Sequence, residues 1–280
     1  MKLVTYDSGA GARVGVLDGD DVVDAAFDGD MVAFIETGAA PAGDGERVTG
    51  ARLLAPLRPR SLRDFLAFEG HLKNAYAALG RDIPAEWYEV PAYYKGMPDT
   101  VVGPDVEVPW PRHTDRLDHE LELAAVIGRP IRDARPEDAA GCIFGYTIWN
   151  DFSARDVQRR EGAVGMGPGK AKDWDGSNVL GPCIVTADEL DPADVAMRVS
   201  VNGELWGEDT SAHMHHTFAD MIAYASRSQT LYPGDVLGSG TAAGGSGLEL
   251  DRWLQPGDVV EMEIQGIGVL RNRIGQKGAA

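Results

Sequence analysis

The segment ELELAAVIG, residues 120–128, is the stretch that decides the fold. Its first half alternates acidic and apolar residues and its second half is wholly apolar, which predicts a β-strand that enters a buried sheet. Because successive side chains of a strand point to opposite faces, Glu120 and Glu122 share one face, whereas Leu121 and Leu123 face the core. Two adjacent carboxylates repel each other unless they are exposed or hold a cation. An all-oxygen cluster suits Mg²⁺, Mn²⁺ or Ca²⁺ rather than zinc.

A second apolar segment, residues 141–151, predicts a buried strand that ends in polar residues. Asp151 at its end is available to a site at the rim of the sheet. Arg155 and Gln158 follow where a helix would start, and Lys172 lies in a glycine-rich loop. Each residue also has an ordinary structural explanation: a helix cap for Asp151, a surface ion pair for Arg155 and a loop charge for Lys172. The two glutamates could equally lie on a solvated strand face.

The rest of the chain predicts an α+β fold with a small N-terminal β unit and a mostly β catalytic domain. The two prolines of residues 56–60 place the boundary, so the expected domains are residues 1–56 and 57–280. We expect a helix from Ser61 to about Leu79, with Ser61 as its cap. Asn202-Gly203 predicts a hairpin turn, and residues 216–228 have helical spacing.

Composition narrows the class of protein. The 26 basic and 44 acidic residues give 26 − 44, a net charge of −18, which disfavours binding to nucleic acids or anionic membranes. The two cysteines, Cys142 and Cys183, are too few for a disulfide framework or a thiolate zinc site. We found neither a signal peptide nor a membrane span, and therefore expect a cytoplasmic protein. The acidity fits a high-salt cytoplasm, and codon bias explains it equally well.

Several segments, in one order along the chain, resemble the fumarylacetoacetate hydrolase family. They cover roughly residues 50–275 and read DHELELAAVIG, GYTIWNDFSARDVQ, KAKDWDGSNVLGP, VNGE, LYPGDVLGSGT and GDVVEMEIQGIGVLRN. An ordered set of this length is far more specific than the pair of glutamates. The resemblance implies the mixed β-roll of that family for the catalytic domain, and a homodimer.

The resemblance also implies a metal site. The metal carboxylates of the family fall on Glu120, Glu122 and Asp151. In the fumarylacetoacetases proper, a further aspartate ligand lies seven residues before a catalytic histidine. Asp64 and His71 reproduce that spacing. The expected ion is Mg²⁺, with Mn²⁺ or Ca²⁺ as alternatives.

The other implied roles are an acid partner for the histidine, oxyanion stabilisers and substrate contacts. They fall on Glu249 as the acid, on Lys172, Arg155 and Gln158 at the oxyanion, and on Tyr94 and Thr241, with Arg155 and Gln158 again, at the substrate. Two positions depart from the family pattern. An expected tyrosine is replaced by Gly162, and an expected substrate-carboxylate arginine by Gly80, with Arg81 adjacent. These departures concern the identity of the substrate rather than the type of reaction.

The expected activity is metal-dependent hydrolysis of a C–C bond in a small 1,3-dicarbonyl acid, such as an acylpyruvate, with His71 and Glu249 activating water. Similar proteins include decarboxylases, isomerases, hydratases and dehydratases of 2-oxo acids, and the metal carboxylates do not separate these reactions. A different alternative is an acidic β protein that only binds Ca²⁺.

Two further groups of polar residues receive structural explanations. His213, His215 and His216 resemble metal ligands, but they precede a helix without a recognised ligand spacing, so we expect loop or interface roles. Glu69 is separated from His71 by about 200° around a helix, and we expect it to be solvated.

Overall fold

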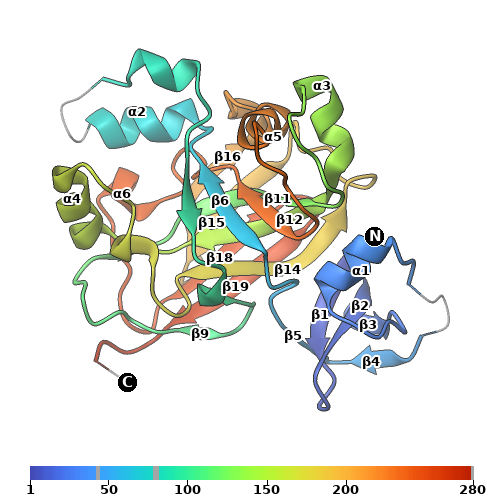
Figure 1. Ribbon diagram of the computed structural model, residues 1–280. Helices are drawn as coiled ribbons and strands as arrows, with labels where there is room; N and C mark the ends of the chain where they lie inside the picture. The colour runs from blue at the N-terminus through green and yellow to red at the C-terminus, as the bar shows by residue number, and fades with distance from the viewer. Residues whose placement is uncertain (42–44, 78–81, 279–280) are drawn as a thin grey trace.

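The computed structural model describes residues 1–41, 45–77 and 82–278, and β-sheets dominate it (Figure 1). The largest sheet has the strand order β4-β3-β2-β1-β14-β12-β11-β17-β6-β7, with β5 pairing with β1 and β8 with β14. Its strands are β1 (Lys2–Asp7), β2 (Ala12–Asp18), β3 (Asp21–Asp24), β4 (Arg47–Thr49), β5 (Arg52–Leu53), β6 (Ser61–Phe65), β7 (Tyr93–Gly96), β8 (Val101–Val102), β11 (Leu121–Ile127), β12 (Ile143–Asp151), β14 (Asn178–Thr186) and β17 (Asp235–Gly238).

A five-stranded sheet and a two-stranded sheet complete the β structure of the described residues. The first has the order β16 (Glu204–Thr210), β15 (Ala196–Val201), β18 (Val259–Ile264), β19 (Gly268–Ile274) and β9 (Glu107–Val108); the second pairs β10 (Leu117–Asp118) with β13 (Ser153–Ala154). The helices are α1 (Met31–Thr37), α2 (Glu69–Ala77), α3 (Pro136–Ala139), α4 (Arg155–Val164), α5 (Phe218–Ala225) and α6 (Gly247–Leu250), with 3-10 turns η1 (Ala85–Tyr88), η2 (Pro98–Thr100), η3 (Ala140–Cys142), η4 (Lys170–Lys172) and η5 (Ser211–His213). The predicted α+β class, mostly β, is confirmed.

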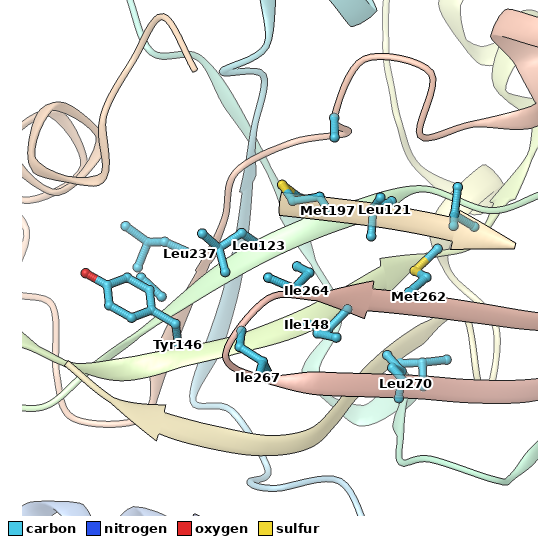
Figure 2. Packing of buried hydrophobic residues seen from close by; sticks show 14 of the residues in the cluster. Leu121, Leu123, Tyr146, Ile148, Met197, Leu237, Met262, Ile264, Ile267 and Leu270 are labelled. Atoms are coloured by element: carbon cyan, nitrogen blue, oxygen red, sulfur yellow. The ribbon is translucent and has the colours of Figure 1, made fainter. Parts of the chain in front are cut away.

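The β11 strand separates two environments. Leu121 and Leu123 lie on the face that packs against the five-stranded sheet; Figure 2 shows Leu121 beside Met197, and Leu123 near Leu237 and Ile264. The opposite face carries Glu122, followed by residues that belong to a second, smaller core. The alternation of residues 120–123 therefore predicted correctly that Leu121 and Leu123 face the core, and the face that carries Glu122 is buried as well.

The N-terminal strands continue the large sheet, because β1 pairs with β14 through Leu3 and Ile184. The blue part of Figure 1 shows these strands together with α1, a helix that the sequence patterns did not predict. Asp30 caps α1 by accepting a hydrogen bond from the backbone N–H of Ala33 at 2.8 Å. The domain boundary after residue 56 stays a prediction.

The helix expected from Ser61 to Leu79 is wrong in its first part. Residues Ser61–Phe65 form β6, which pairs in parallel with β17 and antiparallel with β7. Ser61 caps no helix; α2 begins only at Glu69, and Leu79 lies outside the described residues. Short apolar runs fit either period, and here two long-range strand pairings outweigh the local helical spacing.

Other local predictions are confirmed. Asn202 and Gly203 have positive φ angles of 53° and 78° in the turn between β15 and β16. The helix predicted within residues 216–228 is α5, which Thr217 and Asp220 cap reciprocally. Among residues 1–41, 45–77 and 82–278, none of the helices has the length and apolar character that a bilayer crossing requires.

Gly238 of β17 allows side chains from two other strands to meet. It pairs with Asp64 of β6 on one side and with Ala124 of β11 on the other. A Cβ atom at this position would lie 2.6 Å from Glu122 Oε2 and 2.6 Å from Trp149 Cε3. The missing side chain therefore leaves the space in which Asp64 and Glu122 approach each other across β17.

We predict that Gly238→Ala destabilises the protein by roughly 1–3 kcal/mol, because the added methyl group overpacks this space. The matched control is Gly162→Ala in α4, where an added Cβ meets no atom within 4 Å and alanine favours the helix by up to about 1 kcal/mol. Urea unfolding of both variants measures the difference. Equal stability of Gly238→Ala and wild type would contradict the packing argument.

Candidate active site

Four acidic side chains meet in one buried cluster. Asp64, Glu120, Glu122 and Asp151 each offer an oxygen, and these oxygens lie within 4.8 Å of one another. All four residues are at most 4% exposed. They come from β6, from the residue before β11, from β11 and from the end of β12, so strands of the large sheet position them. The carboxylates selected from the sequence therefore come together in the fold.

The cluster has the properties of a site for a hard cation. Asp64 Oδ1, both oxygens of Glu122 and Asp151 Oδ1 are buried without a hydrogen-bond partner among the described residues. Unpaired buried carboxylate oxygens are costly, and oxygen-only clusters are the ligands of hard divalent ions. The donor set thus fits the divalent metal expected from the sequence, and the cluster could hold such an ion.

Two cations lie against this cluster. Lys172 Nζ contacts Glu120 Oε2 at 2.5 Å and also pairs with Asp151. Arg155 lies 2.7 Å from Glu120 Oε1, and its Nε donates to Asp118 at 2.7 Å. When all four carboxylates are ionised, these two cations leave two negative charges, even if both cations are assigned to the cluster. A divalent ion would balance this excess.

The pKa values of the clustered carboxyls differ according to whether a cation outweighs the effect of burial. Burial raises the pKa of Glu120, but the charges of Lys172 and Arg155 outweigh that effect and lower the pKa to about 2. For Asp64 and Glu122, burial and the neighbouring carboxylates hold the pKa values well above the ordinary range. Without a cation, Asp64 and Glu122 are therefore the carboxyls of the cluster that most readily keep their protons, and a divalent ion would displace those protons.

A histidine–carboxylate pair lies beside the cluster. His71 of α2 places its Nδ1 2.9 Å from Glu249 Oε2 of α6. Glu249 also accepts hydrogen bonds from Asn74 at 2.8 Å and from Ser246 and the Gly244 N–H at 2.9 Å each. Burial raises the pKa of Glu249, and these hydrogen bonds, that from His71 first, reverse the shift and lower it. An ionised Glu249 fixes the proton on Nδ1 and leaves His71 Nε2 as a base.

His71 lies close enough to the cluster that a proton on its ring would lower the pKa of Glu120. Figure 1 shows α2, α4 and α6 on one side of the molecule; α2 carries His71, α6 carries Glu249, and α4 carries Arg155 and Gln158. Tyr94 of β7 donates to Asp151, and Lys172 lies 5.3 Å from the centre of its ring. Burial is the main cause of a strongly raised pKa of Tyr94, which keeps the phenol protonated.

The other residues selected from the sequence have no contact with the clustered carboxylates among the interactions described. Gln158 accepts a hydrogen bond from Arg155 at 2.9 Å, and Thr241 is buried in the loop after β17. Gly80 and Arg81 lie outside the described residues. The catalytic and binding roles of all these residues stay predictions.

The residues for which the sequence analysis expected no catalytic role form ion pairs or ring contacts outside the cluster. His213 pairs with Asp209 at 2.5 Å, and His215 and His216 pack against Trp87. Glu69 contacts Lys73 at 3.0 Å. Among the described residues, none of these side chains belongs to the acidic cluster.

Sequence reasoning missed two supporting residues. Asp118 is fully buried and holds Arg155, and it also accepts the N–H groups of Gly247 and Leu248 at 2.8 and 3.1 Å. Its position two residues before Glu120 continues the strand alternation, which was the available signal. Asn74 lies three residues after His71 on α2, a spacing that places both side chains on one helix face.

The fold and the site define a class of enzyme with a carboxylate cluster at the edge of a mixed β fold. Residues 61–275 match the family described as fumarylacetoacetate (FAA) hydrolase C-terminal. The mitochondrial protein of Rattus norvegicus named oxaloacetate tautomerase Fahd2a is 32% identical over 279 residues, covering 97% of this chain and 87% of that protein. The chain therefore belongs to the fumarylacetoacetate hydrolase family.

Solved structures show the same relationship. A fumarylacetoacetate hydrolase from Exiguobacterium antarcticum has a TM-score of 0.84 at 32% identity, covering 99% of this chain and 100% of that one. A structure titled 5-carboxymethyl-2-hydroxymuconate delta-isomerase, from Mycobacterium smegmatis, has a TM-score of 0.81 at 31% identity with the same coverage. Relatives with similar folds thus carry the names of a hydrolase, an isomerase and a tautomerase.

We predict that Mg²⁺ or Mn²⁺ stabilises the wild-type protein, by about 5 °C in Tm when the ion is present at one hundred times its Kd. Glu122→Gln removes one of the charges that the ion balances, so the ion should shift its Tm much less. Glu263→Gln, an exposed position of β18, is the matched control and should respond like wild type. Differential scanning calorimetry with and without EDTA measures the shift. An equal shift in Glu122→Gln would argue against metal binding at the cluster.

Proposed function

We propose that this protein acts on small 2-oxo acids that form enols, and that its main reaction is hydrolysis of a C–C bond in a 1,3-dicarbonyl acid such as an acylpyruvate. One observation carries the proposal: the His71–Glu249 pair lies beside the buried carboxylate cluster. A reaction that only moves a proton within the substrate does not need an activated water, whereas hydrolysis does.

Asp64, Glu120, Glu122 and Asp151 would hold the divalent ion, for which we propose Mg²⁺, with Mn²⁺ or Ca²⁺ as alternatives. When bound, such an ion supplies a Lewis acid that withdraws electron density from an oxo group and stabilises the enolate form. The protein contributes a dry environment, since all four carboxylates are at most 4% exposed.

The His71–Glu249 pair supplies the base in this proposal. Glu249 accepts the Nδ1–H and thereby orients the ring, which leaves Nε2 to take a proton from water. Three further donors, Asn74, Ser246 and the N–H of Gly244, hold the Glu249 carboxylate in place. The resulting hydroxide attacks the carbonyl carbon, and the C–C bond breaks to give a carboxylic acid and an enolate. The enolate carbon then takes up the proton held on His71 Nε2, which gives the second acid and restores the base.

Lys172 and Arg155 are suited to stabilise the oxyanion that develops during this attack. Burial lowers the pKa of Lys172, but Asp151 and Glu120 outweigh that effect and raise it, so the ammonium stays charged. Arg155 Nη2 is buried without a hydrogen-bond partner among the described residues, so it can donate to a bound anion. Gln158, which accepts from Arg155, would assist, while Tyr94 and Thr241 would contact the substrate.

Tautomerisation or isomerisation of a 2-oxo acid is a second candidate. The observation that favours it is that a relative matching almost the whole chain is named an oxaloacetate tautomerase and a structural relative an isomerase. Both reaction classes begin with a bound, enolisable oxo acid, so the cluster and Lys172 would serve either. Decarboxylation, hydration and dehydration of 2-oxo acids begin in the same way. The homodimer and the cytoplasmic location stay predictions.

We predict that His71→Asn lowers the rate of acylpyruvate hydrolysis by at least about 10²-fold, because a positioned general base contributes about 10²–10⁴-fold. Stabilisation by Mg²⁺ should remain, since His71 is not one of the clustered carboxylates. His213→Asn is the matched control, because the His213 side chain is 68% exposed and pairs only with Asp209 among the contacts described. Wild-type turnover by His71→Asn would rule out this base.

A substrate panel separates the candidate reactions. Acylpyruvates, oxaloacetate and 2-keto-3-deoxy acids are supplied with Mg²⁺ or Mn²⁺, loss of enol absorbance is followed, and the products are identified by NMR. Hydrolysis gives two smaller acids from an acylpyruvate, whereas tautomerisation conserves the mass of oxaloacetate. We expect the former at the higher kcat/KM. Absence of turnover for every compound with either ion would favour the alternative of a Ca²⁺-binding protein without activity.

A further inference from the structure

A cavity of about 390 Å³ opens beside the strand that carries Asp64. Its walls come from β6, from β7 and from the end of α5 with the turn that follows. The main lining residues are Arg63, Tyr93, Lys95, Tyr224, Arg227 and Gln229. None of these residues has a role in the proposed hydrolysis.

This cavity lies on the other face of the sheet from the carboxylate cluster. Arg63 pairs with Lys95, and Asp64 with Tyr94, across β6 and β7. Because neighbouring residues on a strand point to opposite faces, Arg63 and Lys95 project away from the cluster that Asp64 enters. The cavity is therefore a separate site.

Arg63 is the strongest indication that the cavity binds something. The residue is 8% exposed, and its Nε has no hydrogen-bond partner among the described residues. Its Nη1 donates to Ser61 Oγ at 2.5 Å and forms an ion pair with Asp235 at 3.6 Å, and Asp235 also accepts hydrogen bonds from Ser61 Oγ and the Tyr232 N–H. Among the described residues these contacts use Nη1 alone, so the guanidinium keeps further N–H donors, and an oxyanion in the cavity would pair with this group.

The charge of the lining points the same way. Arg63, Lys95 and Arg227 are cationic, and the lining contains no acidic residue, in a chain with 44 acidic and 26 basic residues. The concentration of positive charge thus runs against the charge of the whole molecule. A guanidinium group can donate two parallel hydrogen bonds to two oxygens of one carboxylate or phosphate group. Two arginines in the lining therefore favour an anion of this kind.

Aromatic rings form the remaining wall. Tyr93 and Tyr224 have ring centres 6.3 Å apart, and the Arg227 guanidinium lies 5.1 Å from the centre of the Tyr224 ring. The stacking holds Arg227 at the mouth of the cavity while its N–H groups stay available for an anion. The rings also offer a surface for the apolar part of a small molecule.

We propose that this cavity is a binding site for a small oxyanion, a carboxylate or phosphate group, that pairs with Arg63 and Arg227. The site is independent of the metal cluster and of the proposed hydrolysis. Lys95, exposed at the edge of β7, adds to the attraction of the anion.

Isothermal titration calorimetry of the full chain in EDTA tests the proposal, with inorganic phosphate and with succinate as probes at constant ionic strength. We expect saturable binding of one anion per chain. Arg227→Gln changes an exposed side chain and should weaken binding at least tenfold, as should Arg63→Gln. Arg198→Gln, an exposed arginine of β15, is the control and should bind like wild type. Tighter binding of phosphate or of succinate identifies the preferred group.

Lys172→Met separates this site from the carboxylate cluster and should leave anion binding unchanged. The proposal is overturned if neither anion binds saturably, if Arg227→Gln binds as tightly as wild type, or if binding is lost in Lys172→Met. Circular dichroism establishes that each variant is folded. Should Arg63→Gln fail to fold, Arg227→Gln still decides the outcome, because its side chain is at the surface.

Discussion

Burial of four carboxylates within 4.8 Å of one another is the constraint on which the rest of the site depends. Lys172 and Arg155 offset part of the repulsion, and Asp118 holds Arg155 in position from behind. Such a group of like charges would separate if it were carried on flexible loops. Instead, the strands of one sheet fix it, and burial makes each remaining charge costly unless a cation is present.

The order of the strands explains how distant residues reach this cluster. Asp64 belongs to β6 and Glu122 to β11, with β17 between them. Gly238 on β17 has no side chain to fill the gap, so the two carboxylates meet across it. The strand β6 pairs with β7 on its other side, and Arg63 of β6 and Lys95 of β7 project from the opposite face of the sheet. The acidic cluster and the basic cavity therefore lie on opposite faces of the sheet at β6 and β7.

The sequence was informative where short-range periodicity decides the structure. Alternation over residues 120–123 predicted which side chains face the core, and Asn202-Gly203 predicted a hairpin. The structure of residues 61–65 could not be predicted in this way, because their strand state depends on pairing with β17, more than 170 residues away. Asp64 was nevertheless identified from its spacing to His71 in the resemblance, although the local prediction of a helix around it was wrong.

Local sequence patterns could not predict the contacts between segments that are far apart in the chain. The partners of Glu249 come from α2 and from its own loop, and Arg155 reaches Asp118 from 37 residues further along the chain. The cavity around Arg63 joins three segments whose cationic residues form no motif in the sequence. These arrangements follow from tertiary packing, so the residues that carry chemistry were easier to select than those that position them.

The central claim is that the four buried carboxylates bind one divalent ion, and Mn²⁺ tests it most directly through its anomalous scattering. Crystals soaked in Mn²⁺ together with a slowly reacting oxo-acid analogue should give one strong anomalous peak per chain, surrounded by the oxygens of Asp64, Glu120, Glu122 and Asp151. The analogue should lie beside that peak. Absence of a peak at the cluster, or a peak only elsewhere on the protein, would contradict the account.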